Sequence, residues 1–277
     1  MELDKTKQEA KQIRRDIIDM THAVGTHGAH IGGSLSAVEL FATLYFNIMR
    51  YDKNNMTSED RDRFILSKGH AAMTLYATLH RIGVVTDEEI KTFKGNGSKF
   101  ANHPYMYPEK GVEFSSGSLG HGLSLGVGTA LALRHKGNNT SKVFVYQGDG
   151  ECDEGSVWEA AMSASHYGLN NIILIVDRNK IQLDGFTEDI MSQETISERF
   201  RSFGWEVSTI NGHDIDDIYS KISTGIANQK GPIAFIANTT KGKGVSFIEN
   251  RYEWHIGTLN DKLYNQAIEE LNNEGNQ

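Results

Sequence analysis

The sequence predicts an α/β fold: a doubly wound, mostly parallel sheet with helices on both of its faces. Two short runs of β-branched and aromatic residues, 143–146 and 172–176, have the length and composition of buried strands. A helical stretch, 156–167, lies between them and completes a βαβ unit. The alternation continues over all 277 residues without a repeat or a linker, which predicts one domain, residues 1–277.

The other elements follow from apolar periodicity and from helix-start signals. Ser36 and Glu39 have the spacing of a capping box that opens a helix at Ala37. Thr86 and Glu89 repeat this spacing before a shorter helix. Helices are predicted over residues 5–24, 37–49, 71–80, 89–93, 156–167, 197–203, 214–227 and 259–271, and strands over 62–67, 143–146, 172–176, 205–210 and 232–237.

A further helix, ending near residue 135, contains several glycines. Gly122, Gly126 and Gly128 each cost about 1 kcal/mol of helix stability relative to alanine. A helix that keeps them is expected to lie very close to another backbone, and we predict that this neighbour belongs to another subunit. The preceding residues, 95–118, form an irregular loop of a length that usually indicates a function.

Composition argues against several classes of partner. The net charge of −8 and the absence of a basic run argue against nucleic acids and anionic membranes. No apolar run is long enough to span a bilayer, and the first residues do not resemble a signal peptide. The single cysteine, Cys152, fits a reducing cytoplasm, where we expect the protein to act, and is interpreted as a bystander thiol.

The most informative polar residues follow the two central strand runs. Gly148-Asp149-Gly150 ends the first run, and Asn179 comes just past the second. In an open parallel sheet such ends lie side by side, and ligands bind there. A carboxylate and an amide oxygen suit Mg²⁺, while the glycines and the next helix N-terminus favour a phosphate. The glycine spacing fits neither a dinucleotide-binding loop nor a P-loop. An acidic turn with a capping asparagine is the simpler alternative.

Four of the eleven histidines lie in loops beside predicted strand ends or helix starts. They are His30, His70, His103 and His255. Imidazoles hydrogen-bond hydroxyl groups and move protons near neutral pH, so several at one cleft suit a polyol substrate that carries a phosphate. No H-E-x-x-H zinc spacing occurs. The histidines interpreted as surface or packing residues are His22, His27, His80, His135, His166 and His213.

The Gly-Asp-Gly turn with Asn179 thirty residues after Asp149 resembles the thiamine diphosphate motif. Further segments resemble the amino-terminal, pyrophosphate-binding part of transketolase, and the resemblance covers most of the chain. These segments are HIGGSLS (30–36), RDRFILSKGH (61–70), GSLGHG (117–122), DRNKI (177–181), KGKGVS (241–246) and WH (254–255). The resemblance implies a thiamine diphosphate-binding fold in which Asp149, Asn179 and the main-chain carbonyl of Ile181 hold Mg²⁺ against the diphosphate.

The resemblance also implies roles for other residues. The residues implied in catalysis are His30, His70, His103, His255 and Glu154, the last in a proton network between subunits. The residues implied in cofactor binding are His70, Gly117, Ser118, Leu119, Gly148, Asp149, Gly150, Glu151, Asn179 and His255.

Transketolase chains usually continue for two further domains, whereas this sequence ends after the first. The resemblance therefore implies the amino-terminal subunit of a split transketolase, active only with a separate carboxyl-terminal, pyrimidine-binding subunit. That partner would supply the glutamate that activates the cofactor. We expect a heterotetramer with two copies of each chain, which uses thiamine diphosphate and Mg²⁺ to move a two-carbon ketol unit from a ketose phosphate to an aldose phosphate.

Three alternatives remain open at this point. A thiamine enzyme similar to deoxyxylulose phosphate synthase is compatible with residues 30–33, although Trp254-His255 favours transketolase. A non-catalytic regulatory chain that kept the fold is the second, and the intact Asp149 and Asn179 argue against it. A free-standing metal hydrolase is the third.

Overall fold

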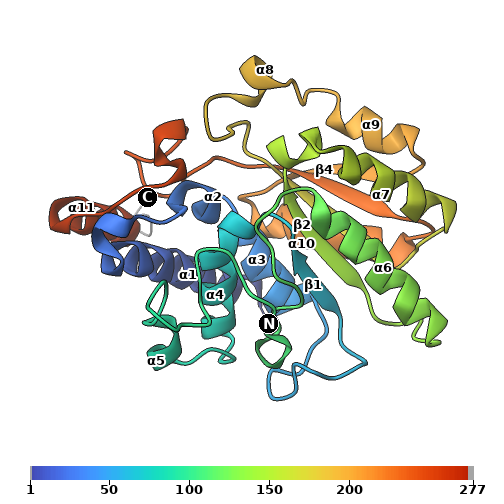
Figure 1. Cartoon of the computed structure of the whole chain (residues 1–277), viewed down its shortest axis with the longest axis horizontal. Helices are drawn as coiled ribbons and strands as arrows, with labels where there is room; N and C mark the ends of the chain where they lie inside the picture. Colours follow the sequence, from blue (N-terminus) through green and yellow to red (C-terminus); the bar gives the residue numbers. More distant parts are fainter. Residues whose placement is uncertain (1, 274–277) are drawn as a thin grey trace.

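The structure, a computed structural model, describes residues 2–273. Five parallel strands form one sheet in the order β1-β2-β3-β5-β4. The strands are β1 (Arg63–Leu66), β2 (Val143–Gly148), β3 (Ile172–Arg178), β4 (Glu206–Asn211) and β5 (Ile233–Asn238). Helices cover both faces of the sheet (Figure 1), so the predicted doubly wound α/β fold is confirmed.

The helices divide between the two faces. One face is covered by α6 (His121–His135), α7 (Gly155–His166) and α9 (Ile196–Ser202). The other is covered by α1 (Leu3–Ala23), α3 (Val38–Thr43) and α10 (Ile215–Asn228), with α4 (Ala72–Arg81) and α11 (Asp261–Asn273) packed against α1. The short helices are α2 (Ile31–Leu35), α5 (Asp87–Ile90) and α8 (Thr187–Ile190).

The central strands are buried on both sides, which explains their unbroken apolar runs. In β2, Phe144 and Tyr146 join the core beneath α1 and α3, whereas Val143 and Val145 join the core beneath α6 and α7. Among residues 2–273, no helix is long and apolar enough to cross a membrane.

The predicted capping box at Ser36 and Glu39 is wrong. Helical structure begins at Ile31, and Ala37, which precedes α3, has helical dihedral angles and no side-chain cap. The Ser36 hydroxyl instead contacts Asp177 at 2.7 Å, and Glu39 pairs with Arg14. Both side chains are buried, so their strongest partners come from distant parts of the chain rather than from the neighbouring backbone.

The second capping box is confirmed at α5. The Thr86 hydroxyl accepts from the Glu89 amide at 3.2 Å, and the Glu89 carboxylate accepts from the Thr86 amide at 2.9 Å. The other predicted helices and strands are present, and their ends shift by at most three residues, except that the helix predicted over 37–49 is α3 followed by a π-helical turn, Leu44–Ile48.

Two of the three glycines of α6 lie against the same chain, as the predicted close approach to another backbone requires. A Cβ added at Gly126 would lie 2.5 Å from Val145 Cγ2, and one at Gly122 would lie 2.2 Å from Ser67 Cβ. A Cβ at Gly128 would meet nothing within 4 Å. The close approach at Gly122 and Gly126 is therefore to Ser67, just after β1, and to β2 of the same chain. That another subunit packs on α6 stays a prediction.

Candidate active site

The two informative strand ends meet at the carboxyl edge of the sheet. Gly148 pairs with Asp177 across β2 and β3, so Asp149 and Asn179 both follow directly at the same edge. The Asp149 carboxylate accepts from the Lys180 amide at 2.7 Å and from the Gly150 amide at 2.8 Å. The parallel register therefore brings together the two residues that the sequence places far apart.

Asp149 is a buried carboxylic acid whose charged form is not fully compensated by nearby positive charge. Its side chain is 3% exposed, and burial together with the nearby Asp177 raises its pKa to about 6. Asn179 is also buried, and its Oδ1 accepts from the Ile181 amide at 3.0 Å. A divalent cation at this edge would supply the compensating charge that Asp149 lacks.

A cavity of about 220 Å³ opens at this edge. It contains most of the residues for which the sequence predicted a cofactor role. Its walls are Lys68, His70, Leu119, Gly148, Asp149, Gly150, Glu151, Asn179, Ile181, Gln182, Leu183, Lys241 and His255.

The four predicted histidines converge beside this cavity. The ring of His30 lies 5.6 Å from that of His70, 5.2 Å from that of His103 and 5.2 Å from that of His255, measured between centroids. Burial lowers the pKa of His30 to about 4, and burial with the nearby Lys241 lowers that of His255 to about 3. The pKa values of His70 and His103 are lowered by burial as well. The cluster is therefore neutral at pH 7, and its rings can both donate and accept hydrogen bonds.

Lys241 lines the same cavity as Asp149. Its ammonium donates to the carbonyls of Ile181 at 3.3 Å and Gln182 at 2.9 Å, and lies 3.0 Å from His255 Nδ1. Burial and the neighbouring Lys68 lower the pKa of Lys241 to about 7. The sequence placed Lys241 in a matching segment but assigned it no role.

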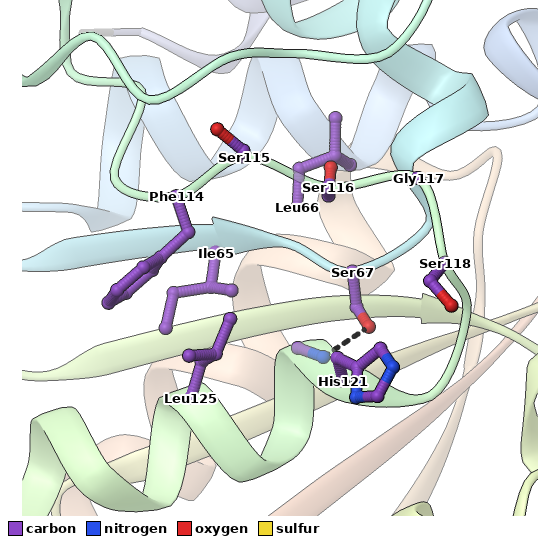
Figure 2. Close-up of a pocket in the computed structure, with 11 residues that line it drawn as sticks. Ile65, Leu66, Ser67, Phe114, Ser115, Ser116, Gly117, Ser118, His121 and Leu125 are labelled. Carbon is purple, nitrogen blue, oxygen red and sulfur yellow. Dashed lines mark hydrogen bonds between the residues drawn. The ribbon is translucent and has the colours of Figure 1, made fainter.

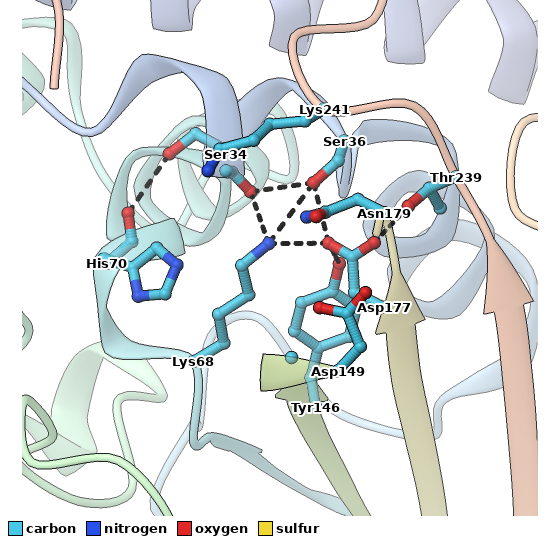
Figure 3. A network of polar contacts seen from close by, with 12 residues as sticks. Ser34, Ser36, Lys68, His70, Tyr146, Asp149, Asp177, Asn179, Thr239 and Lys241 are labelled. Carbon is cyan, nitrogen blue, oxygen red and sulfur yellow. Dashed lines mark hydrogen bonds and ion pairs between the residues drawn. The ribbon is translucent and has the colours of Figure 1, made fainter. Parts of the chain in front are cut away.

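A buried ion pair that the sequence did not reveal supports the floor of the site. Lys68 contacts Asp177 at 2.6 Å, and the same carboxylate accepts from Ser36, Tyr146 and Thr239 (Figure 3). Burial acts to raise the pKa of Asp177, but Lys68 and the hydroxyl donors outweigh it and hold the pKa below its usual value. The only sequence signal was position, since both residues lie at the ends of predicted strands.

Glu151 lines the cavity, but its carboxylate is already occupied by the protein. It accepts from the Ser67 hydroxyl, from the Gly120 amide at 2.8 Å and from the Gly148 amide at 3.0 Å. These bonds connect the end of β1, the start of α6 and the end of β2. Glu151 therefore has a structural role, in addition to the cofactor contact that the resemblance implies.

Two of the predicted cofactor residues lie in the next cavity instead. Gly117 and Ser118 line a space of about 230 Å³ between β1 and the start of α6 (Figure 2), whereas Leu119 lines the first cavity.

Glu154, the remaining predicted catalytic residue, is exposed just before α7. It lies against the same turn, because a Cβ added at Gly120 would be 2.6 Å from Glu154 Cβ.

The donor chemistry of the site fits a hard cation and an anion. In the described part of the chain, no group of three or more His, Cys, Asp or Glu residues is arranged to hold a metal ion. Asp149, Asn179 and the Ile181 carbonyl instead offer a small set of oxygen atoms, which suits Mg²⁺ completed by phosphate and water. Lys241 adds a positive charge to the wall of the same cavity.

Comparison with known proteins identifies the family. The model of the family described as "Transketolase, thiamine diphosphate binding domain" matches residues 5–275. The chain belongs to the transketolase family. It is 40% identical to one subunit of the apulose-4-phosphate transketolase of Actinobacillus succinogenes, over 98% of this chain and 97% of that protein. It is 38% identical to one subunit of the 6-deoxy-6-sulfo-D-fructose transketolase of a Clostridium species, over 97% of each.

Other members of the transketolase family are much longer. Human transketolase is 32% identical over 97% of this chain, which spans 42% of that protein. The structure of transketolase from Campylobacter jejuni superposes with a TM-score of 0.90 at 29% identity, over 98% of this chain and 43% of that one. The chain therefore spans nearly all of the two bacterial subunits but less than half of these transketolases.

Proposed function

We propose that this chain is the thiamine diphosphate-binding, amino-terminal subunit of a split transketolase. The observation that carries the proposal is one cavity with oxygen donors at one end and neutral imidazoles beside it. The oxygen donors suit a metal-bound diphosphate, and the imidazoles suit a sugar. The similarity to two proteins that are named as transketolase subunits supports it.

In this proposal Asp149, Asn179 and the Ile181 carbonyl hold Mg²⁺, and Lys241 faces the diphosphate. Thiamine diphosphate, when bound, supplies the nucleophilic carbon that takes up the two-carbon unit. The protein contributes a low-dielectric pocket wall in which electrostatic interactions are strengthened, because Lys68, Asp149 and Lys241 are buried.

The histidine cluster would bind and orient the sugar. His30 Nδ1 is buried and has no hydrogen-bond partner among the described residues, so the fold leaves one polar atom of this cluster unsatisfied. Because burial keeps these rings uncharged at pH 7, each can donate through one nitrogen and accept through the other. His30, His70, His103 and His255 can thus position hydroxyl groups and exchange protons with them.

The rest of the enzyme would come from a second polypeptide. We propose that this partner is a carboxyl-terminal, pyrimidine-binding subunit, and that the two form a cytoplasmic heterotetramer with two copies of each chain. Glu154, exposed beside the Gly117–Gly120 turn, is our proposed link to the partner's proton network. The substrates would be a ketose phosphate donor and an aldose phosphate acceptor.

The test is reconstitution. This chain and the candidate partner encoded beside it are purified separately and together, then assayed with thiamine diphosphate, Mg²⁺ and a panel of ketose donors that includes pentose and hexose phosphates. We expect two-carbon transfer only from the mixture. Activity of this chain alone would refute the split site. Condensation of pyruvate with a triose phosphate, without ketol transfer, would replace the proposed reaction with that of a deoxyxylulose phosphate synthase.

A further inference from the structure

The segment that carries Lys241 is held on both sides of this residue by side chains outside the cavity. Lys241 lies in the turn after β5 and is 1% exposed. Its ammonium points toward Ile181, Gln182 and His255. The backbone of Thr240, directly before it, and of Lys243, two residues after it, is bound by side chains from elsewhere in the fold.

The first contact is made by His213, from the connection between β4 and α10. The Thr240 amide donates to His213 Nε2 at 2.7 Å. Because a backbone amide can only donate, Nε2 must be the unprotonated nitrogen and Nδ1 carries the proton. His213 Nδ1 then donates to Glu39 Oε2 at 2.9 Å. The ring is therefore a neutral imidazole of defined tautomer, oriented by Glu39 of α3.

The second contact is made by Arg14 of α1. Its Nη2 pairs with Glu39 Oε1, and its Nε donates to the Lys243 carbonyl at 3.0 Å. A Cβ added at Gly244 would lie 2.6 Å from Arg14 Cδ, so the arginine packs directly on the backbone after Lys243. Arg14 and Glu39 are 5% and 8% exposed, which makes this a buried network of matched charges.

We propose that Arg14, Glu39 and His213 form a positioning network that fixes the 240–243 backbone and thereby aims Lys241 into the cofactor cavity. None of the three lines that cavity. His213 and Arg14 bind the backbone on either side of Lys241, at the Thr240 amide and the Lys243 carbonyl. Ordering a mobile segment when the ligand binds would reduce the affinity. A backbone that already holds Lys241 in its binding position avoids this loss of conformational entropy.

The role of Lys241 toward a diphosphate rests on the proposed function, whereas the positioning of its backbone does not. The first experiment therefore uses no ligand. Hydrogen exchange is measured by mass spectrometry on the full chain and on two matched variants of one residue. In His213→Asn the side chain keeps a polar atom near the Nδ1 position and loses the acceptor for Thr240. In His213→Gln it keeps an acceptor near the Nε2 position. We expect faster exchange of the 239–244 amides in His213→Asn, and near wild-type exchange in His213→Gln.

The second experiment measures thiamine diphosphate affinity by calorimetry, with Mg²⁺, in the full chain assembled with its partner. We expect His213→Asn to bind about tenfold more weakly, as for the loss of one hydrogen bond, and His213→Gln to recover most of the affinity. Lys241→Met is expected to weaken binding too, and adding His213→Asn to it should cause no further loss. Asp216→Asn, an exposed change close by on α10, should bind like the wild type.

The outcomes separate the two proposals. Unchanged exchange at 239–244 in His213→Asn, or losses of affinity that multiply in the double variant, would overturn the positioning network. If the wild-type assembly binds no thiamine diphosphate, the proposed function fails, and the exchange measurement still decides whether the network fixes the segment.

Discussion

Asp149 is a carboxylate that the fold holds in place without balancing its charge. Two backbone amides orient it, while burial and Asp177 raise its pKa to about 6. Natural proteins place such groups where a ligand completes them. At the scale of one residue, this imbalance is the clearest sign that the edge of the sheet is built for a cation.

The first prediction concerns this residue. Replacing Asp149 with alanine removes the only carboxylate in the proposed oxygen set, and we expect thiamine diphosphate affinity in the presence of Mg²⁺ to fall about 100-fold or more. Equilibrium dialysis of the assembled complex measures it. Asp184→Asn is the control, because Asp184 is exposed in the loop after Ile181. Equal retention of the coenzyme by the Asp149 variant would contradict the metal site.

The second prediction concerns Glu39 and acid. Burial acts to raise the pKa of Glu39, but the charge of Arg14 and the hydrogen bond from His213 outweigh it and lower the pKa to about 2. A depressed carboxyl pKa stabilises the fold above the unfolded-state value, and the benefit is lost as the pH falls toward the folded-state value. A shift of roughly two units corresponds to about 3 kcal/mol. Glu39→Gln should therefore cost about this much at pH 7 and progressively less below about pH 4.

Urea unfolding of both proteins from pH 7 to pH 3 checks this prediction. Glu269→Gln, on the exposed side of α11, is the control and should show no pH-dependent difference. A destabilisation by Glu39→Gln that stays constant over this range would show that lost packing, and not charge, causes it.

At the scale of the element, α6 contains two glycines in opposite settings. Gly126 is pressed against Val145 of β2, whereas Gly128 faces open space. We predict that Gly126→Ala destabilises the chain by about 1–3 kcal/mol through overpacking. Gly128→Ala should stabilise it by about 0.5–1 kcal/mol, because alanine favours the helix. Denaturant unfolding measures the change in unfolding free energy of each variant. Changes of the same sign in both variants would contradict the difference in packing between Gly126 and Gly128.

The helix starts show which local signals a sequence can carry. Thr86 and Glu89 are the capping box of a surface helix, and nothing competes for them. Ser36 and Glu39 have the same spacing but are buried, and Asp177 and Arg14 bind them instead. The alternating elements and the Gly-Asp-Gly turn were predictable because each depends on neighbouring residues.

The parts of the site that escaped prediction depend on distant pairs. Lys68 and Asp177 are 109 residues apart, and Glu39 and His213 are 174 apart. No periodicity or short motif relates residues at such separations, and only the parallel sheet and the packing of α1 and α3 bring them together. Lys241 could be placed beyond a strand end from sequence, but its contacts with Ile181 and His255 could not.

At the scale of the whole molecule, metal and cofactor should act as one ligand. Lys68, Lys241, Asp149 and Asp177 lie at the same edge, so a diphosphate alone would lie near two carboxylates and a cation alone near two ammonium groups. We predict that thiamine diphosphate and Mg²⁺ together raise the unfolding temperature of the assembled complex, and that either one alone raises it much less. At concentrations 100-fold above the dissociation constant, the gain in unfolding free energy should be about 2.7 kcal/mol. Scanning calorimetry with each ligand and with both measures it, and an equal shift from thiamine diphosphate alone would contradict a metal-bridged diphosphate.

Trp254 precedes His255 in the chain and packs against Phe247, with 5.3 Å between ring centroids. The other two tryptophans, Trp158 and Trp205, lie together on the opposite side of the sheet, near α7 and α9. Changing those two to phenylalanine would leave a single indole next to the cavity. The protein thus contains its own fluorescent reporter, whose emission can follow events at His255 in real time and without a label.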